Sequence, residues 1–231
     1  MLKISGLNQF YGESHTLWDV ELIVEAGKCT CLMGRNGVGK TTLLNCIMGQ
    51  LSLQSGNMEY EGKDLTRLPM EQRARLGIGY VPQGRQIFPM LTVEENLQIG
   101  LPARRDKKKQ VPEYIYELFP VLKEMLGRRG GDLSGGQQQQ LAIGRALVID
   151  PKLLILDEPT EGIQPNVVAE IGDVIRKLNR EIGLTVLLVE QKLPFVRKVA
   201  DSFFILDRGR CKANGSVDEL SEELVKEYLT V

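Results

Sequence analysis

The sequence predicts an α/β domain with a largely parallel sheet, a peripheral antiparallel sheet and an inserted helical lobe. Two short apolar runs, Leu153–Leu156 and Val186–Val189, alternate with segments of helical spacing, as in a parallel sheet that helices cover on both faces. A third apolar run, Lys28–Met33, leads into a glycine-rich loop that precedes another helical pattern. This strand–loop–helix order is typical of nucleotide-binding α/β folds.

Length and composition favour one globular domain without a strong electrostatic attraction to nucleic acid. The chain has 231 residues and a formal net charge of -1, with a pI near 6.0, so it lacks the positive field of a nucleic-acid-binding protein. No apolar run approaches the ~20 residues that span a bilayer, and the N-terminus has no signal region. We therefore expect a cytoplasmic protein whose four cysteines are buried, reduced thiols.

The first third of the chain predicts the antiparallel sheet and the first parallel strand. Apolar and polar residues alternate on both sides of a turn at Tyr11-Gly12, which indicates a strand pair, and helical spacing follows the glycine-rich loop. Gly56-Asn57 and Glu61-Gly62 are turn residues of an expected hairpin. The expected elements are strands within 2–25, a strand at 28–33, a helix at 41–48 and a hairpin at 55–63.

The middle of the chain predicts the helical lobe. Helical spacing extends from about 91 to 126, and one apolar face carries Tyr114, Ile115, Leu118 and Phe119, with no intervening strand pattern. The basic stretch within 104–109 is interpreted as a solvated loop between helices.

Strand–helix alternation resumes after Gly127–Gly131. The expected elements are a helix at 137–148, a strand at 153–156, a helix at 167–181 and a strand at 185–189. We therefore predict a single domain, 1–231, in which 1–90 and 146–231 form the α/β core with its antiparallel part and 91–145 form the helical lobe.

The glycine-rich loop is the strongest chemical signal in the sequence. It fits the pattern G-x-x-x-x-G-K-[ST] between a predicted strand and helix. Its glycines let backbone N–H groups face one concavity, and the helix N-terminus adds positive potential for phosphate. Lys40 supplies a charge to the β- and γ-phosphates of ATP, and the Thr41 hydroxyl is a ligand for Mg²⁺. The predicted nucleotide-binding residues are Gly34, Arg35, Asn36, Gly37, Val38, Gly39, Lys40, Thr41 and Thr42.

Two adjacent carboxylates, Asp157 and Glu158, follow the apolar run that ends at Leu156. In open α/β sheets, ligand groups gather at the carboxyl ends of the strands. Asp157 is expected to hold Mg²⁺, directly or through its water, and Glu158 to orient and polarise the attacking water. An Asp-Glu-Pro strand end is also a common turn, and the phosphate loop is what favours the functional interpretation.

The pentapeptide Leu133-Ser134-Gly135-Gly136-Gln137 precedes a helix and the acidic strand, and with it the sequence resembles the ATP-binding-cassette (ABC) family. Ser134 and the Gly136 amide at a helix N-terminus form a second anion site without a nucleotide of its own. The resemblance implies a P-loop NTPase core of RecA-like fold. It also implies a head-to-tail pair of cassettes, in which Ser134–Gln137 of one chain contact the ATP of a second, identical or related, ATPase subunit.

Two further positions take roles that the resemblance implies. Tyr11 matches the aromatic residue that stacks on adenine. Gln83, in Tyr80-Val81-Pro82-Gln83, matches the glutamine between the lobes that touches Mg²⁺ or water and reports ATP to the helical lobe. The implied partners are transmembrane permease subunits, reached through the region 83–97, and indirectly an extracytoplasmic solute-binding protein. The chain is then expected to lie peripherally on the inner face of the cell membrane.

The sequence departs from the family pattern at two positions. Gln191 stands where most members have a histidine that contacts the γ-phosphate, and the only histidine of the chain is His15. An amide donates a hydrogen bond but does not titrate near neutrality, which favours Glu158 as the main polarising group. Gln164 stands where many members have an aspartate at the subunit interface, so the family role of that aspartate is in doubt here.

The departures favour one branch of the family. Gln191 and the segment Pro82–Pro89 resemble the branched-chain amino acid and urea importers. Within that branch, 159–165 and 190–195 look most like the urea-transporter subunit, so urea or a similar small amide is the first expectation and branched-chain amino acids are the alternative.

Two other functions stay open. A soluble ABC ATPase acting on DNA or ribosomes usually carries two cassettes or a coiled-coil arm, and this sequence shows one cassette and no heptads. A regulatory cassette that only binds ATP is disfavoured by intact Lys40, Asp157 and Glu158.

Overall fold

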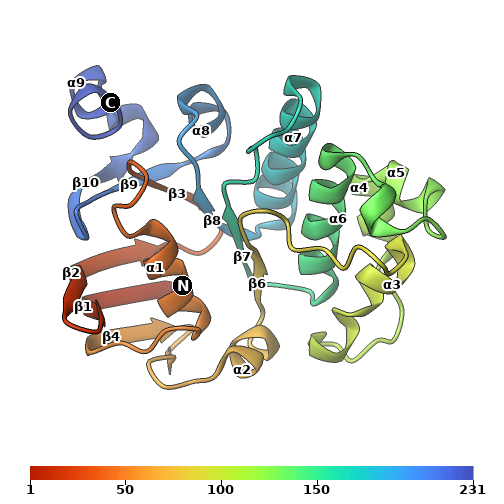
Figure 1. Ribbon diagram of the computed structural model, residues 1–231, viewed down its shortest axis with the longest axis horizontal. Helices are drawn as coiled ribbons and strands as arrows, with labels where there is room; N and C mark the ends of the chain where they lie inside the picture. Colours follow the sequence, from red (N-terminus) through yellow and green to blue (C-terminus); the bar gives the residue numbers. More distant parts are fainter. Residues whose placement is uncertain (231) are drawn as a thin grey trace.

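The computed structural model describes residues 1–230 and contains two β-sheets and a helical lobe (Figure 1). The strand orders are β2-β1-β4-β5 in the first sheet and β10-β9-β3-β8-β7-β6 in the second. The strands are β1 Leu2–Tyr11, β2 Ser14–Val24, β3 Cys29–Met33, β4 Ser55–Tyr60, β5 Lys63–Asp64, β6 Ile78–Val81, β7 Leu153–Asp157, β8 Thr185–Val189, β9 Ser202–Asp207 and β10 Arg210–Ser216.

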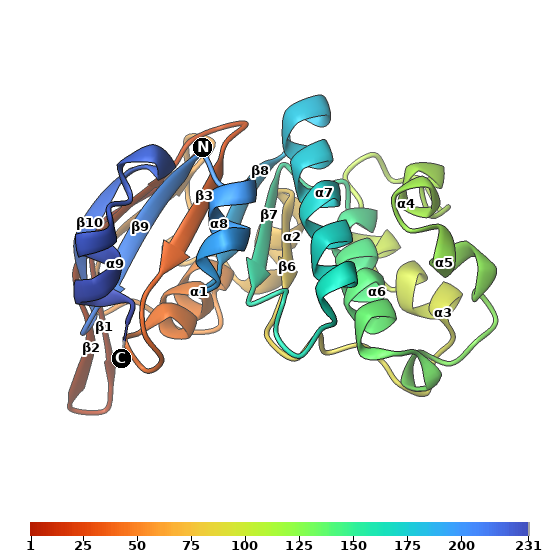
Figure 2. The ribbon, with the colours of Figure 1, turned by 90° about the horizontal axis from the view of Figure 1, so that it is seen from above.

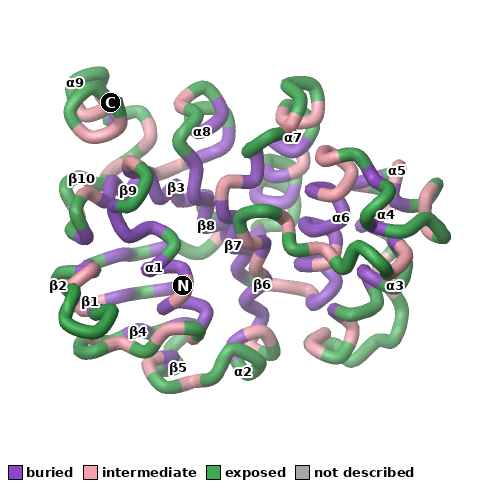
Figure 3. Tube along the Cα trace, viewed as in Figure 1, coloured by how far each residue is buried: buried purple, intermediate pink, exposed green. Residues whose placement is uncertain are grey.

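The second sheet is parallel except at one edge, where β10 pairs antiparallel with β9. Every residue of β3, β7 and β8 is buried, because layers cover both faces (Figure 3). Leu154 and Leu156 of β7 join the core that includes α7, α8 and α6, whereas Leu153 and Ile155 join the core that includes α1 and the antiparallel sheet. The parallel sheet expected from the apolar runs is confirmed.

The antiparallel sheet is also present, with one difference from the expectation. Gly56 and Asn57, predicted as turn residues, lie inside β4, where Asn57 pairs with Ser5 of β1. A Cβ atom on Gly56 would lie 2.4 Å from the Gly6 carbonyl oxygen, so the glycine permits close strand approach at a register shift. The second predicted turn, Glu61-Gly62, does connect β4 to β5.

The helices predicted at 41–48, 137–148 and 167–181 are present and differ mainly at their starts, whereas the helical pattern predicted from about 91 to 126 is interrupted between α3 and α4. The helix expected from 137 begins at Gly135, because Ser134 caps it, and the one expected from 167 begins with Pro165, a residue suited to the first helical position. The helices are α1 Lys40–Met48, α2 Met70–Arg75, α3 Val93–Gln98, α4 Glu113–Leu118, α5 Pro120–Glu124, α6 Gly135–Val148, α7 Pro165–Ile182, α8 Leu193–Val199 and α9 Glu222–Tyr228.

The helical lobe and the antiparallel sheet lie at opposite ends of the molecule, with the parallel sheet between them (Figure 2). The lobe packs on its own apolar face, where Ile115 and Phe119 are buried and Tyr114 and Leu118 are partly buried. In the basic loop Arg104 pairs with Asp106 at 2.5 Å, and Arg105 pairs with Asp150, just after α6, at 2.8 Å, so the loop is held to the end of that helix. No helix within 1–230 combines the length and apolar character of a membrane span.

Candidate active site

The phosphate loop connects β3 to α1 and is shaped by glycines. A Cβ atom on Gly34 would lie 2.3 Å from the Leu206 carbonyl oxygen, so only glycine lets the loop pass β9 this closely. Gly39, with φ 110°, forms the N-cap of α1, a conformation that favours glycine. The first-turn N–H groups of α1 have no acceptor within the helix and suit an anion.

Lys40 lies inside the loop. Its side chain is 6% exposed, and Nζ donates to the carbonyl oxygens of Gly34 at 2.8 Å and Arg35 at 2.9 Å. Burial lowers the pKa of Lys40, and the negative charges of Glu158 and Asp157 oppose that shift. The ammonium group is therefore anchored at the centre of the loop, where a phosphate would meet it.

The other side chains of the loop point in several directions. Asn36 Oδ1 accepts a hydrogen bond from Gln191 Nε2 at 2.8 Å. The Arg35 guanidinium instead contacts the carbonyl oxygens of Glu227 and Thr230 near the C-terminus, and Val38 packs in the core beside the antiparallel sheet. Arg35 and Val38 can thus offer only their backbone to a nucleotide. The sequence pattern did not distinguish residues that contribute side chains from residues that contribute only backbone.

Asp157 ends β7 and has the properties of a metal ligand. The residue is 3% exposed, and its buried Oδ2 atom has no hydrogen-bond partner within the described chain, which a cation would supply. Burial, and then the neighbouring charge of Glu158, raise the pKa of Asp157 to about 6. Residues 1–230 contain no group of three or more His, Cys, Asp or Glu that could hold a metal, so Mg²⁺ would need the predicted mixed set of Asp157, Thr41, Gln83 and phosphate oxygens.

Side chains from several loops of the site surround the carboxylate of Glu158. Its backbone has φ 48°, an uncommon conformation for a residue other than glycine, and its N–H donates to the Val189 carbonyl at 2.9 Å. The carboxylate accepts from Gln191 Nε2 at 2.7 Å and from Gln83 Nε2 at 3.4 Å. Its Oε1 atom lies 4.0 Å from Lys40 Nζ.

These contacts bring together most of the residues predicted to act on the phosphates. Lys40, Asp157, Glu158, Gln83 and Gln191 come from four separate segments that meet at the carboxyl ends of β3, β6, β7 and β8. The structure adds Glu161, whose Oε2 atom accepts from Gln83 Nε2 at 3.0 Å. In the sequence, only its position three residues after Glu158 pointed to Glu161.

Two groups of predicted residues lie apart from this cluster. Tyr11, 50% exposed, ends β1 at the hairpin turn, beside a stack in which His15 lies 3.9 Å from Phe10 and 3.4 Å from Trp18 between ring centroids. Ser134–Gln137 begin α6 in the helical lobe, and no hydrogen bond joins them to the phosphate loop within the described residues.

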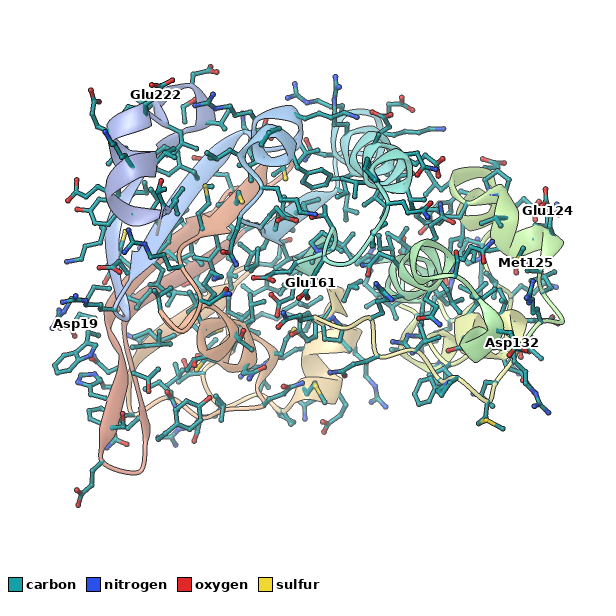
Figure 4. All side chains as sticks on the ribbon, turned by 45° about the horizontal axis from the view of Figure 1, so that its top comes forward. Asp19, Glu124, Met125, Asp132, Glu161 and Glu222 are labelled. Atoms are coloured by element: carbon teal, nitrogen blue, oxygen red, sulfur yellow. The ribbon has the colours of Figure 1, made fainter. Side chains whose placement is uncertain are left out.

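Figure 4 shows that the segment Ser134–Gln137 lies apart from the cluster, with Glu161 near the centre of the molecule and Asp132, two residues before Ser134, in the helical lobe. The start of α6 is well formed: Gln137 Oε1 accepts from the Ser134 N–H at 2.9 Å. The helix start on which the second anion site was predicted is thus formed, and no hydrogen bond within the described residues joins it to the phosphate loop of its own chain.

Comparisons with known proteins agree with this geometry. A family described as ABC transporter matches residues 17–161. The high-affinity branched-chain amino acid transport ATP-binding protein BraG of Pseudomonas aeruginosa is 44% identical over 211 residues, 91% of this chain and 90% of that protein. The probable branched-chain amino acid transport ATP-binding protein LivF of Archaeoglobus fulgidus is 40% identical, covering 96% and 94%.

Solved structures show the same fold. A nucleotide-free ATP-binding cassette from an ABC transporter is 30% identical with a TM-score of 0.84, covering 99% of this chain and 94% of that one. A dimeric cassette in a post-hydrolysis state, bound to ADP and Pi, is 25% identical with a TM-score of 0.83, covering 94% and 99%.

Proposed function

The chain belongs to the ABC transporter family and is an ATPase of that family, and from this premise we propose that it powers an importer of branched-chain amino acids. The two relatives named for that transport support the choice, since each is matched over at least nine tenths of both chains. This reverses the order of solutes predicted from short motifs, where urea came first. Urea becomes the second candidate, supported only by the segments 159–165 and 190–195.

The proposed chemistry uses the cluster at the carboxyl ends of the parallel strands. The oxygen of a water molecule attacks the γ-phosphorus, the bond to the β–γ bridging oxygen breaks, and ADP leaves. Lys40 and the loop N–H groups hold the phosphates, and Glu158 polarises the water, oriented by the amides of Gln191 and Gln83. When bound by Asp157, Thr41 and Gln83, Mg²⁺ would neutralise phosphate charge. The 4.0 Å separation of Lys40 and Glu158 carries this proposal.

We propose a second cassette as the first partner. Ser134–Gln137 form an anion site that their own phosphate loop does not use, so a head-to-tail pair would complete two nucleotide sites. The dimeric cassette with 25% identity supports such an arrangement.

Permease subunits are the second proposed partner, and through them a solute-binding protein. Phe88, Met90 and Ile99 are exposed by 46%, 71% and 43%; the first two lie between Gln83 and α3, and Ile99 directly follows α3. Exposed apolar side chains grouped in this way favour a protein interface. The chain would then lie on the inner face of the membrane without entering it.

The test is recovery of named transporter subunits from native membranes. A tagged chain should co-purify with a permease pair and a second cassette. M90D should lose them because it places a charge in the exposed apolar segment, whereas I182D, which alters an exposed apolar residue on α7, should retain them. Ribosomal or DNA-repair partners in place of a permease would contradict the transport function and leave the ATPase assignment intact.

Uptake identifies the solute. A strain lacking the gene should lose accumulation of labelled leucine and regain it with the wild-type gene, but not with a Lys40→Ala gene. Loss of urea accumulation with normal leucine uptake would support the second candidate instead.

A further inference from the structure

A buried carboxylate that the proposed chemistry does not use lies directly beside the site. Glu190 follows β8 and is 3% exposed. Its Oε1 atom accepts from the backbone N–H groups of Gln191 at 2.8 Å and Lys192 at 3.1 Å. Its Oε2 atom accepts from the hydroxyl of Thr160, itself 0% exposed, at 2.5 Å. Three donors thus satisfy a charge that would be costly to bury alone.

These hydrogen bonds join the loops that follow β7 and β8. Lys192 adds a further link, because its Nζ atom donates to the Thr160 carbonyl at 2.8 Å. Thr160 lies two residues after Glu158 in one loop, and Gln191 lies between Glu190 and Lys192 in the other. The Glu190 carboxylate therefore braces, at one point, the two loops that carry Glu158 and Gln191.

Gln191 depends on such a brace because its own side chain is exposed and has several rotatable bonds. Its amide must meet Glu158 Oε1 at 2.7 Å and Asn36 Oδ1 at 2.8 Å at the same time. A backbone held by Glu190 limits the positions from which the amide can reach both atoms.

We infer that Glu190 is a positioning residue, which fixes the backbone of Gln191 so that its amide orients the Glu158 carboxylate during hydrolysis. The inference rests on the proposed roles of Glu158 and Gln191 and adds the group that holds them together. Glu190 acts through Gln191 and makes no contact with the nucleotide. A purely structural role would instead change stability and leave the turnover number unaltered.

The first experiment compares E190A with E190Q and with E181A, which alters an exposed glutamate on α7. Steady-state hydrolysis of Mg·ATP by the full chain should show kcat reduced on the order of 10- to 100-fold in E190A, because small misplacements of catalytic groups have effects of this size. KM should change by less than about threefold, because the phosphate cradle persists. E190Q should recover most of kcat, since its carbonyl oxygen can accept from both backbone N–H groups. E181A should match the wild type.

The second experiment tests whether the effect passes through Gln191. In a Q191A background, adding E190A should leave kcat unchanged, since residues that act through one another are non-additive. Thr160→Val removes one donor to Glu190 and nearly preserves volume; it should lower kcat less than E190A, and only when Gln191 is present. If E190A does not fold, the kcat values of T160V and E190Q, measured with and without Gln191, test the same role.

Additive losses in the double variant, or wild-type kcat in E190A alongside a lowered unfolding midpoint, would overturn the positioning role. Those results would leave the ATPase chemistry standing. Absence of hydrolysis by the wild-type chain together with intact Mg·ATP binding would instead contradict the proposed chemistry, and the role of Glu190 with it.

Discussion

At the scale of single residues, the site depends on a few side chains whose environments differ sharply. Asp157 is buried with an unpartnered oxygen, whereas the Glu158 side chain is 17% exposed and takes hydrogen bonds from two amides. This difference supports the separate tasks proposed for the two adjacent carboxylates: the buried one suits a cation and the solvent-accessible one suits water.

Replacing Glu158 with glutamine should uncouple nucleotide binding from hydrolysis. The amide retains an oxygen that can accept a hydrogen bond from Gln191, but it is neutral and a poor base, so it cannot polarise the attacking water as a carboxylate does. We therefore expect kcat to fall by orders of magnitude, about 10²-fold or more. The Kd for ATP, measured by calorimetry, should stay close to the wild-type value. Near-normal turnover in Glu158→Gln would refute the role assigned to this carboxylate.

Asp157 should make the stability of the nucleotide-free, Mg²⁺-free chain depend on pH. Its folded-state pKa of about 6 lies above the ordinary value of 3.8, so between these values the folded chain holds a proton that the unfolded chain has lost. Stability should therefore fall as pH rises from 4.5 to 6.5, by about 2 kcal/mol from this group. Urea unfolding at a series of pH values measures this change in the free energy of unfolding, and the Asp157→Asn variant is the control. Equal pH slopes in the two proteins would contradict the buried, ionisable state.

At the scale of elements, each of the two predicted anion sites lies at a helix N-terminus. The N-terminus of α1 lies within the phosphate loop, and that of α6 carries Ser134 and Gln137 in a reciprocal cap. Gly136, in the first turn of α6, lies against α7, where a Cβ atom would come within 2.9 Å of the Val167 side chain. The absence of a side chain at Gly136 thus lets the start of α6 lie close to α7.

Ser134→Ala and Thr92→Ala form a matched pair, because both residues cap a helix through a reciprocal hydrogen-bond pattern. Each change should lower the free energy of unfolding by about 1 kcal/mol, as measured with urea. Only Ser134→Ala should also lower ATP hydrolysis, since its hydroxyl is proposed to serve the partner's γ-phosphate. Equal rates of ATP hydrolysis in the two variants, at equal free energies of unfolding, would argue against this contact between Ser134 and the γ-phosphate.

At the scale of the whole molecule, each chain carries two predicted half-sites that no hydrogen bond joins within the described residues. The phosphate loop lies by the parallel sheet and Ser134 lies on the helical lobe (Figure 2). Gln83 follows β6 and is hydrogen-bonded to Glu158 and Glu161 on the core side. Nucleotide binding should therefore be linked to association of two chains and to the position of the lobe.

Association should be visible with the Glu158→Gln chain, which binds ATP but hydrolyses it slowly. Light scattering should detect a dimer with Mg·ATP and a monomer with ADP. Adding Ser134→Glu should prevent the dimer because it places a negative charge opposite the γ-phosphate. Asn57→Glu adds the same charge to the exposed surface of β4 and should not prevent it. Dimer formation that does not depend on the nucleotide, or that persists in the Ser134→Glu variant, would contradict the head-to-tail arrangement.

The sequence by itself determined the local features of this protein. The strand at 185–189, the phosphate loop, the acid pair and the helix start near Ser134 depend on residue types at short spacing, and the structure has them within two residues of the expected positions. Turn residues were less certain: Gly56 was misplaced because a glycine at a close strand approach has the same sequence signal as one in a turn.

Only the tertiary structure decided which segments meet. The order β3-β8-β7-β6 brings Asn36, Gln83, Glu158 and Gln191 together from positions up to 155 residues apart, and no local pattern encodes that order. It also revealed Glu161 beside Gln83 and Glu190 beneath Gln191, and it turned Arg35 away from the phosphate site. Such contacts depend on how distant strands pack side by side, which is why residue spacing along the chain could not supply them.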